Sequence, residues 1–334
     1  MERQSEILNY EYKITENILN VINKQENDKI TNIINSYGKS KFRKVGINPI
    51  GNIIIPCEGR STITGDNSVT KNTLDLVTPL TKNMVLTRAG AQIYWDMSGE
   101  VSFPKLPEIT SYWKSENDVV IDGMAGMTFD ELSLTPKRLT TYLYVSLEFL
   151  NQTNKSNTSK IIMSEMTKSI SNKLESTILG SHETDVTIPD GMFTSYIGDS
   201  YTGTTSYDLL VNIENELLEN NGYGEKVCMI TNPAELKVLR NTELSVGTGN
   251  YVYKDGKVLD YPVFVTKNVP STLITDSNGV ILGNFENMVI VNFGGLDITV
   301  DNYSKSKDGI VQLIINSYWN YGWLRPTYVL ASLK

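Results

Sequence analysis

Apolar side chains recur at helical spacing through the first 38 residues, which are otherwise polar. Most neighbouring positions lie three, four or seven residues apart, and this spacing places them on one narrow face of a helix. The apolar positions are Ile7, Ile14, Ile18, Val21, Ile22, Ile30, Ile33 and Ile34. Such a stripe must be buried on its own domain or against another chain, and the pattern favours neither. The candidate contact residues are Ile7, Ile14, Ile18 and Val21.

The segment after this helix is predicted to be a short linker followed by an extended arm. The stretch 38–44 begins with a glycine and is basic, which is more typical of a solvated linker than of a nucleic-acid patch. Its charged residues are Lys39, Lys41, Arg43 and Lys44. Residues 47–87 alternate short apolar pieces with Gly, Pro, Asn and Thr, so we expect few strands and little helix there.

A long hairpin-like unit follows the arm. One strand is predicted at 100–105, ending at Pro104 and Pro107, and a return strand at 138–147 alternates between two faces. Its inward positions are Leu139, Thr141, Leu143, Val145 and Leu147, and its outward positions are Arg138, Thr140, Tyr142, Tyr144 and Ser146. The connection is too polar for a core and too long for a tight turn, and such loops are usually functional or mobile. It contains Trp113, Lys114, Glu116, Asp118, Asp122, Gly123 and Gly126.

Three helices are predicted in the second half of the chain. The longest begins at Thr158 or Ser159, either of which can accept hydrogen bonds from the free amides of the first turn, and it ends at Gly180. Its apolar face consists of Met163, Met166, Ile170, Leu174 and Ile178. A second helix spans 207–220, with Leu210, Ile213, Leu217 and Leu218 inward and Gly222 after its end. A short third helix covers 233–240.

The remaining apolar segments are predicted to be strands. They cover 227–230, 263–266, 280–282, 289–292, 298–300 and the long stretch 310–319. Helices and strands alternate without a regular strand–helix–strand rhythm, which indicates an α+β fold rather than a doubly wound one.

Composition narrows the function classes. The chain has 334 residues, 40% hydrophobic and 20% charged, so it can bury a full core as one large domain or two closely associated ones. A net charge of −8 disfavours a dedicated nucleic-acid binder. Two cysteines and one histidine exclude a disulfide framework and His-rich metal sites. We expect no signal peptide and no membrane-spanning helix.

The search for catalytic residues finds little. His182 lies in a loop whose polar neighbours cannot all converge on one reacting atom. Cys57 and Cys228 lack a nearby second thiol or histidine, and Asp297 and Asp301 are expected to be solvated at strand ends. Gly247-Thr248-Gly249 lacks the context of a phosphate-binding loop and is predicted to be a turn. We therefore expect no enzyme activity, no cofactor and no metal site.

The order of these elements resembles that of the major capsid protein of tailed bacteriophages, the Hong Kong phage fold. Five short motifs occur in the same order as in that family, and the resemblance extends over residues 47–334. They are Leu86-Thr87-Arg88-Ala89-Gly90-Ala91, Thr231-Asn232-Pro233 with Leu236 and Leu239, Tyr261-Pro262-Val263, Gly283-Asn284-Phe285 and Arg325-Pro326-Thr327. The third has Tyr where the family has Gly, and the fourth has Asn284 where the family has Asp. Each motif alone is weak, but their common order is hard to explain by chance.

The resemblance implies a division of the chain into named parts. In chain order they are an N-terminal helical segment and linker (1–45), an extended arm (46–98), an extended hairpin loop with its flanking strands (99–147), a peripheral domain with a long spine helix (148–180), an axial domain (181–301) and a return to the peripheral domain (302–334). The hairpin loop, with Trp113, Lys114, Glu116 and Asp118, would contact a neighbouring subunit. Gly247, Thr248 and Gly249 would form the tip loop of the axial domain.

The implied function is a structural one. The chain would assemble with itself into pentamers and hexamers of an icosahedral shell that encloses double-stranded DNA without sequence-specific binding. The expected partners are a portal, a scaffold or maturation protease, and decoration proteins, and the expected location is the virion after assembly in the bacterial cytoplasm. An encapsulin-like compartment that encloses enzymes is the alternative, since encapsulins share the fold; an unrelated enzyme that uses His182 is a less favoured one.

Covalent links between subunits, which some family members form, are not expected. Those links join a loop lysine to an asparagine beside a catalytic glutamate, and here Gly309 and Asn316 stand at the asparagine and glutamate positions. Lys114 would then have no reaction partner. A shifted alignment leaves Asn320 and Glu286 as less favoured alternatives.

Overall fold

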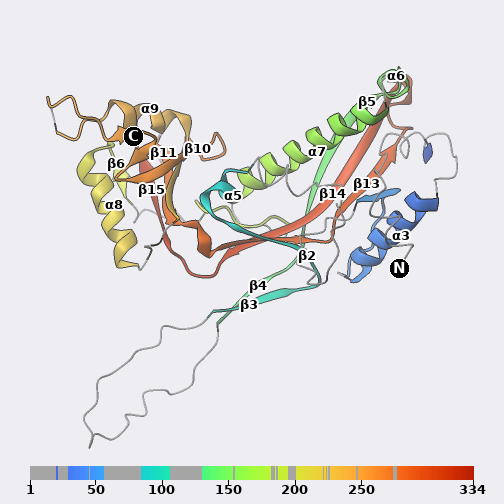
Figure 1. Ribbon diagram of the computed structural model, residues 1–334, viewed down its shortest axis with the longest axis horizontal. Coiled ribbons are helices and arrows are strands. Elements are labelled where there is room, and N and C mark those ends of the chain that lie inside the picture. Colours follow the sequence, from blue (N-terminus) through green and yellow to red (C-terminus); the bar gives the residue numbers. More distant parts are fainter. Residues whose placement is uncertain are drawn as a thin grey trace, which may run out of the picture.

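Two sheets, a long helix laid along one of them and a projecting hairpin make up the protein in the computed structural model (Figure 1). The structure describes residues 20–21, 29–44, 46–55, 84–105, 130–152, 155–181, 185, 187–194, 201–220, 222, 224, 226–245, 247–273 and 277–334. Helices and strands are interleaved, and strand pairing is mostly antiparallel, so the fold is α+β as predicted.

The long sheet has the order β1-β13-β14-β12-β2, with β5 paired to the other edge of β14. Its strands are β1 (Ile53–Ile55), β2 (Gln92–Met97), β5 (Lys137–Ser146), β12 (Met288–Phe293), β13 (Leu296–Asp301) and β14 (Ile310–Trp323). β14 pairs with β5 over ten residues, from Ile310 opposite Ser146 to Trp319 opposite Lys137. The inward and outward positions of β5 alternate as the sequence predicted.

The second sheet lies at the other end of the molecule, with two helices beside it (Figure 1). Its order is β6-β15-β11-β7-β10-β9-β8. These strands are β6 (Thr202–Gly203), β7 (Val227–Thr231), β8 (Tyr253–Lys254), β9 (Lys257–Val258), β10 (Tyr261–Val265), β11 (Asn278–Asn284) and β15 (Tyr328–Leu333), and the helices are α8 (Tyr207–Glu219) and α9 (Pro233–Asn241). The Asn-Pro helix start is confirmed, because the Asn232 side chain accepts a hydrogen bond from the Glu235 amide and Pro233 occupies the first turn.

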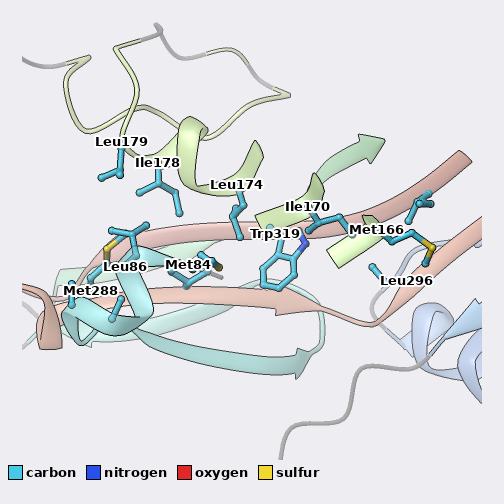
Figure 2. Close-up of a cluster of buried hydrophobic side chains, with 14 of the residues drawn as sticks. Met84, Leu86, Met166, Ile170, Leu174, Ile178, Leu179, Met288, Leu296 and Trp319 are labelled. Atoms are coloured by element: carbon cyan, nitrogen blue, oxygen red, sulfur yellow. The ribbon is translucent and has the colours of Figure 1, made fainter. Parts of the chain in front are cut away.

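The spine helix α7 (Lys155–Ile178) packs along the long sheet and supplies much of the core. Figure 2 shows Ile170 and Leu174 of α7 directed towards Trp319 of β14. Met166, Ile170, Leu174 and Ile178 are all buried, so the predicted apolar face is confirmed at these four positions. Burying each such side chain contributes roughly 1.5–3 kcal/mol, so this interface stabilises the long sheet and α7 together.

Helix α3 (Lys29–Lys44) lies against the opposite side of the long sheet from α7 (Figure 1). The prediction of a linker at 38–44 is wrong, because these residues are the last turns of α3. Gly38 fits closely against Ile54 of β1, and Phe42 is fully buried with its ring 6.1 Å from that of Tyr318. The tertiary contacts therefore hold as helix a segment whose glycine and charges suggested a linker.

The projecting hairpin is formed by β3 (Val101–Lys105) and β4 (Asp130–Leu134). The sequence predicted β3 but missed β4, and it treated β5 as the return strand. In the structure β4 returns beside β3, and β5 then enters the long sheet next to β14. Figure 1 shows the two strands leading away from both sheets.

Several other boundaries differ from the prediction. Helix α7 begins at Lys155, so Thr158 and Ser159 lie inside it, and α6 (Leu147–Gln152) begins at Leu147, which was predicted to be the last inward position of the return strand. Helix α5 (Val85–Ala89) interrupts the predicted extended arm, where Gly90 closes it with a φ of 118°. Leu218 is exposed rather than inward.

The chain crosses between the sheets several times. Strands β12 and β13 belong to the long sheet although they lie within residues 181–301, the predicted axial domain, and β15 returns to the second sheet after β14. The motifs Gly283-Asn284-Phe285 and Arg325-Pro326-Thr327 meet at this crossing. The backbone amide of Asn284 donates to the backbone carbonyl of Thr327 at 2.9 Å, and the Thr327 hydroxyl donates to the backbone carbonyl of Asn284 at 3.2 Å.

Candidate assembly surfaces

The base of the projecting hairpin is fixed to the long sheet. Val101 and Leu134 are paired across β3 and β4 and form a small buried cluster with Val291 and Phe293 of β12. Beyond this cluster the strands continue to Lys105 and Asp130. The predicted contact residues Trp113, Lys114, Glu116 and Asp118 lie outside the described residues. The structure thus defines how the hairpin is anchored, at the point where its extension begins.

The predicted tip loop is an exposed hairpin-like loop after α9. Its base is closed by hydrogen bonds from the Leu244 amide to the Asn250 carbonyl and from the Val252 amide to the Thr242 carbonyl. Gly247 and Gly249 adopt φ values of 84° and 66°, which favour glycine, and the Thr248 hydroxyl donates to the Ser245 carbonyl at 2.6 Å. The prediction of a turn at Gly247-Thr248-Gly249 is confirmed.

A groove of about 670 Å³ lies beside this loop. It runs between the start of α8 and the hairpin of β8 and β9, and its lining includes the exposed apolar side chains Tyr207, Leu244 and Tyr251. The lining also carries charges of both signs, namely Glu214, Lys254, Asp255, Lys257 and Asp260. Exposed Val211 and Leu218 follow Tyr207 along α8 at helical spacing. This mixture of aromatic, aliphatic and charged groups is typical of a protein–protein contact.

Glu214, which lines the groove, is paired with Tyr261. The Tyr261 hydroxyl donates to Glu214 at 2.9 Å. Burial, together with this hydrogen bond and the negative charges of Glu214 and Asp260, raises the pKa of Tyr261 to about 12. Tyr261 therefore remains a neutral hydrogen-bond donor and positions Glu214 rather than acting as an acid or base.

A second open surface is the outer face of β5. Tyr142 and Tyr144 are 63% and 49% exposed, and their rings lie 5.3 Å apart. They stand on the face of the sheet opposite α7, where Thr140 also donates to the Asn316 side chain at 2.9 Å. Tyrosine pairs of this kind supply a large contact area at low entropic cost when another protein surface covers them.

The N-terminal segment is held to the long sheet by Asp297. The prediction that Asp297 is solvated is wrong, because it is only 2% exposed. Its carboxylate accepts hydrogen bonds from the amides of Ile50, at 3.1 Å, and Gly51. Burial raises the pKa of this carboxyl, while the two amides and Lys39 lower it. Asp301, by contrast, is only partly buried and caps the following turn at Tyr303 and Ser304.

A second buried carboxylate joins α9 to the second sheet. Glu235 is fully buried and accepts hydrogen bonds from the Thr205 hydroxyl at 2.6 Å and the Asn278 amide at 3.1 Å. Burial raises its pKa, and the two donors counteract that shift. Both oxygens are engaged within the fold, so this group is structural.

No catalytic constellation is present among the residues that the structure describes. Burial raises the pKa of the Cys228 thiol to about 12, which makes it unreactive at neutral pH. His182 and Cys57 lie outside the described residues. Within the described ranges there is no cluster of three or more side chains that could hold a metal ion, and no helix that is long and apolar enough to cross a membrane.

The positions considered for a covalent subunit link are engaged in other ways. Gly309 forms a left-handed turn with a φ of 65°, and Asn316 accepts the bond from Thr140. Asn320 donates to the Thr135 carbonyl at 2.7 Å, and Glu286 forms an ion pair with Lys226 at 3.1 Å. Asn320 and Glu286, the alternative pair, are therefore each bound to a different residue rather than to one another.

The candidate N-terminal contact residues are only partly described. Val21 is half-buried and packs against the main core of its own chain, whereas Ile7, Ile14 and Ile18 lie outside the described residues. Sequence reasoning missed the groove and the stripe of Tyr207, Val211 and Leu218 as surfaces. The sequence did contain an indication of this surface. Leu210, Ile213 and Leu217 form the apolar face that packs on the core, and the other three residues give α8 a second apolar face that its own core does not need.

Comparison with known proteins agrees with this architecture. The model of the phage capsid family matches residues 73–321. The capsid of an empty GTA particle is similar, with a TM-score of 0.57 and 14% identity over 83% of this chain and 94% of that one. A chain of Microbacterium phage Oxtober96 is also similar, with a TM-score of 0.56 and 10% identity over 83% of this chain and 95% of that one. A chain of Mycobacterium phage Adephagia has a TM-score of 0.54 and 9% identity over 83% of this chain and 94% of that one. No curated protein shows significant similarity to the sequence.

Proposed function

The chain belongs to the phage capsid family and is a structural capsid protein, and we propose that it assembles into the pentamers and hexamers of an icosahedral shell that encloses double-stranded DNA. The family match over residues 73–321 is the observation that carries this proposal. It includes the spine helix, the projecting hairpin and the groove beside the tip loop.

The architecture supports contacts between neighbouring copies. The described part of the hairpin leads away from both sheets, and we expect the segment between its two strands to contact a neighbouring subunit. The tip loop and the groove lie beside the second sheet, and we place this part of the chain around the centre of each ring, as expected for an axial domain. Ordering such extended parts costs conformational entropy, which many simultaneous contacts in a closed shell offset.

The remaining parts of the proposal concern partners and location. A shell of this kind requires a portal and either a scaffold or a protease for maturation, and decoration proteins can bind its outer surface. The shell would form in the cytoplasm of the bacterial host and become part of the virion. The acidic net charge of −8 would limit adhesion of the enclosed DNA to most of the inner surface.

Expression of the full chain alone tests the proposal. Electron microscopy and light scattering of the purified product should show closed particles or rings of five and six subunits. A protein that remains monomeric over a wide range of concentration and salt would contradict the proposal. Particles that enclose enzymes rather than DNA when isolated from their natural source would favour the encapsulin-like alternative.

A further inference from the structure

Helix α3 is unusually basic for this chain. Residues 29–55 contain five lysine or arginine residues and no aspartate or glutamate, although the whole chain has a net charge of −8. The helix also precedes residues 73–321, which match the family model. The basic charge of α3 thus lies outside the part of the chain that the family model matches.

Helix stability alone does not explain this charge pattern. Basic residues in the last turn interact favourably with the helix dipole, which accounts for Arg43 and Lys44. The same effect favours acidic residues in the first turn, and α3 has none there. Lys39 lies further from the helix end, where the dipole contributes little.

One face of α3 is firmly attached to the long sheet. The Asn35 side chain accepts a hydrogen bond from the Ile54 amide at 3.1 Å, Gly38 lies against the Ile54 side chain, and Phe42 packs against Tyr318. These contacts fix the rotation of the helix about its axis. They leave the other face directed away from the protein.

The outward face of α3 presents cations, and within the described part of the chain none of Lys39, Arg43 and Lys44 forms an ion pair. Arg43 and Lys44 are exposed and Lys39 is half-buried, with exposed Ser40 between them. The carboxylate of Asp297, which attracts Lys39, is buried beneath the helix. A further exposed cation, Arg138, stands opposite Tyr318 in the neighbouring strand pair. Together Lys39, Arg43, Lys44 and Arg138 form what we term the α3 basic face.

The α3 basic face matches the chemistry of a nucleic-acid backbone. Lysine, arginine and hydroxyl side chains are the groups that contact phosphates in protein–DNA complexes. Lys39 to Lys44 extend about 8 Å along the helix, which covers two or three phosphates at about 3.4 Å axial spacing. We propose that this face binds the phosphate backbone of the enclosed double-stranded DNA without sequence preference. The inference rests on the proposed capsid function and assigns this side of the sheet to the shell interior.

Salt-dependent DNA binding tests the inference. The unassembled full chain is titrated against a fluorescent 60-base-pair DNA of random sequence, at several salt concentrations. The triple variant Lys39→Gln, Arg43→Gln and Lys44→Gln should bind more weakly, and the slope of log affinity against log salt should fall by about 2 to 3, since each phosphate contact contributes about 0.9. Lys237→Gln, Lys267→Gln and Lys307→Gln make a control with the same change in net charge at exposed sites away from the groove.

The possible outcomes separate this inference from the capsid function. An unchanged slope in the α3 variant, or an equal loss in both triple variants, overturns it. Loss of assembly without loss of DNA binding also overturns it and indicates that a protein segment covers the face. Circular dichroism checks folding, and Arg43→Lys, which keeps the charge, should retain the wild-type slope. Failure of the wild-type chain to form particles would instead contradict the capsid function.

Discussion

The carboxylate of Asp297 accepts a hydrogen bond from the backbone amide of Ile50 at 3.1 Å, although 247 positions separate the two residues in sequence. Ile54 pairs with Asp297 across β1 and β13, so the same residue fixes the N-terminal segment through both its backbone and its side chain. This attachment adds to the contacts of Asn35, Gly38 and Phe42, which hold α3 to the same sheet.

Replacement of Asp297 should reveal the cost of its buried charge. Because burial raises its pKa in the folded state, the contribution of this group to the free energy of unfolding should increase as pH falls from 7 through the folded pKa towards the unfolded value. Asp297→Asn should lack this dependence, and Asp297→Ala should lose roughly 1–3 kcal/mol because the Ile50 amide loses its acceptor. Urea unfolding of the unassembled chain at pH 7 and pH 5 measures both. Identical pH dependence of the wild type and Asp297→Asn would contradict the prediction.

Gly38→Ala should destabilise the protein although alanine is the better helix former. In an unconstrained helix this change stabilises by up to about 1 kcal/mol. Here the added Cβ would lie 2.3 Å from a methyl group of Ile54, so the helix or β1 must shift. The control is Ser40→Ala on the exposed face of α3, which should be neutral or stabilising. A gain in thermal stability for Gly38→Ala would show that the contact is loose.

Charges on the N-terminal stripe should impair assembly. Ile14→Asp combined with Ile18→Asp should reduce the yield of correct shells while the body of the protein stays folded, as circular dichroism would show. Asn17→Asp with Asn20→Asp adds the same charge at polar positions and serves as the control. A normal particle yield from the isoleucine variant would favour a helix that only covers its own domain, the arrangement that Val21 already adopts.

Polar substitutions beside the tip loop should weaken ring formation. Leu244→Ser with Tyr251→Ser removes two exposed apolar groups from the groove lining, so the monomer should lose little stability. The subunit contact should weaken by a few kcal/mol if these residues are central to it. Analytical ultracentrifugation measures the shift towards monomers. Ile188→Ser, at an exposed site away from the groove, should assemble as the wild type does.

Mature particles should contain no covalent subunit links. Gly309 offers no amide side chain, and Asn316 offers no carboxylate to accept a proton, so the lysine–asparagine reaction lacks two components. Denaturing gel electrophoresis should give one band at the monomer mass. Ladders that survive boiling in detergent and reductant would show that another asparagine and acid perform the reaction.

Local patterns predicted the elements that local sequence determines. The apolar spacing of Met166, Ile170 and Leu174 identified α7, and the alternation along β5 identified both of its faces. These signals are strong because each element buries one regular face against a single partner layer. The Asn232 cap was readable for the same reason, since it acts within four residues.

Features that depend on distant partners could not be predicted in this way. Helix α3 continues through Gly38 because Gly38 packs against Ile54 and Phe42 packs against Tyr318. Asp297 is buried because the N-terminal segment folds over it. Strands β4 and β15 were missed although they are as long as predicted strands such as β3 and β12, and their partners became evident only from the pairing. The groove combines α8 with β8 and β9, which lie more than 30 residues apart in sequence.

Strand β14 also has a mechanical consequence. Its 14 residues extend about 46 Å, and the ladder to β5 lies parallel to that length. A pull along the strand loads all hydrogen bonds of this ladder at the same time, whereas a pull across it would break them one after another. In the proposed shell, tension directed along β14, such as that from the pressure of enclosed DNA, would therefore be shared over the whole ladder, and helix α7 beside it would resist bending.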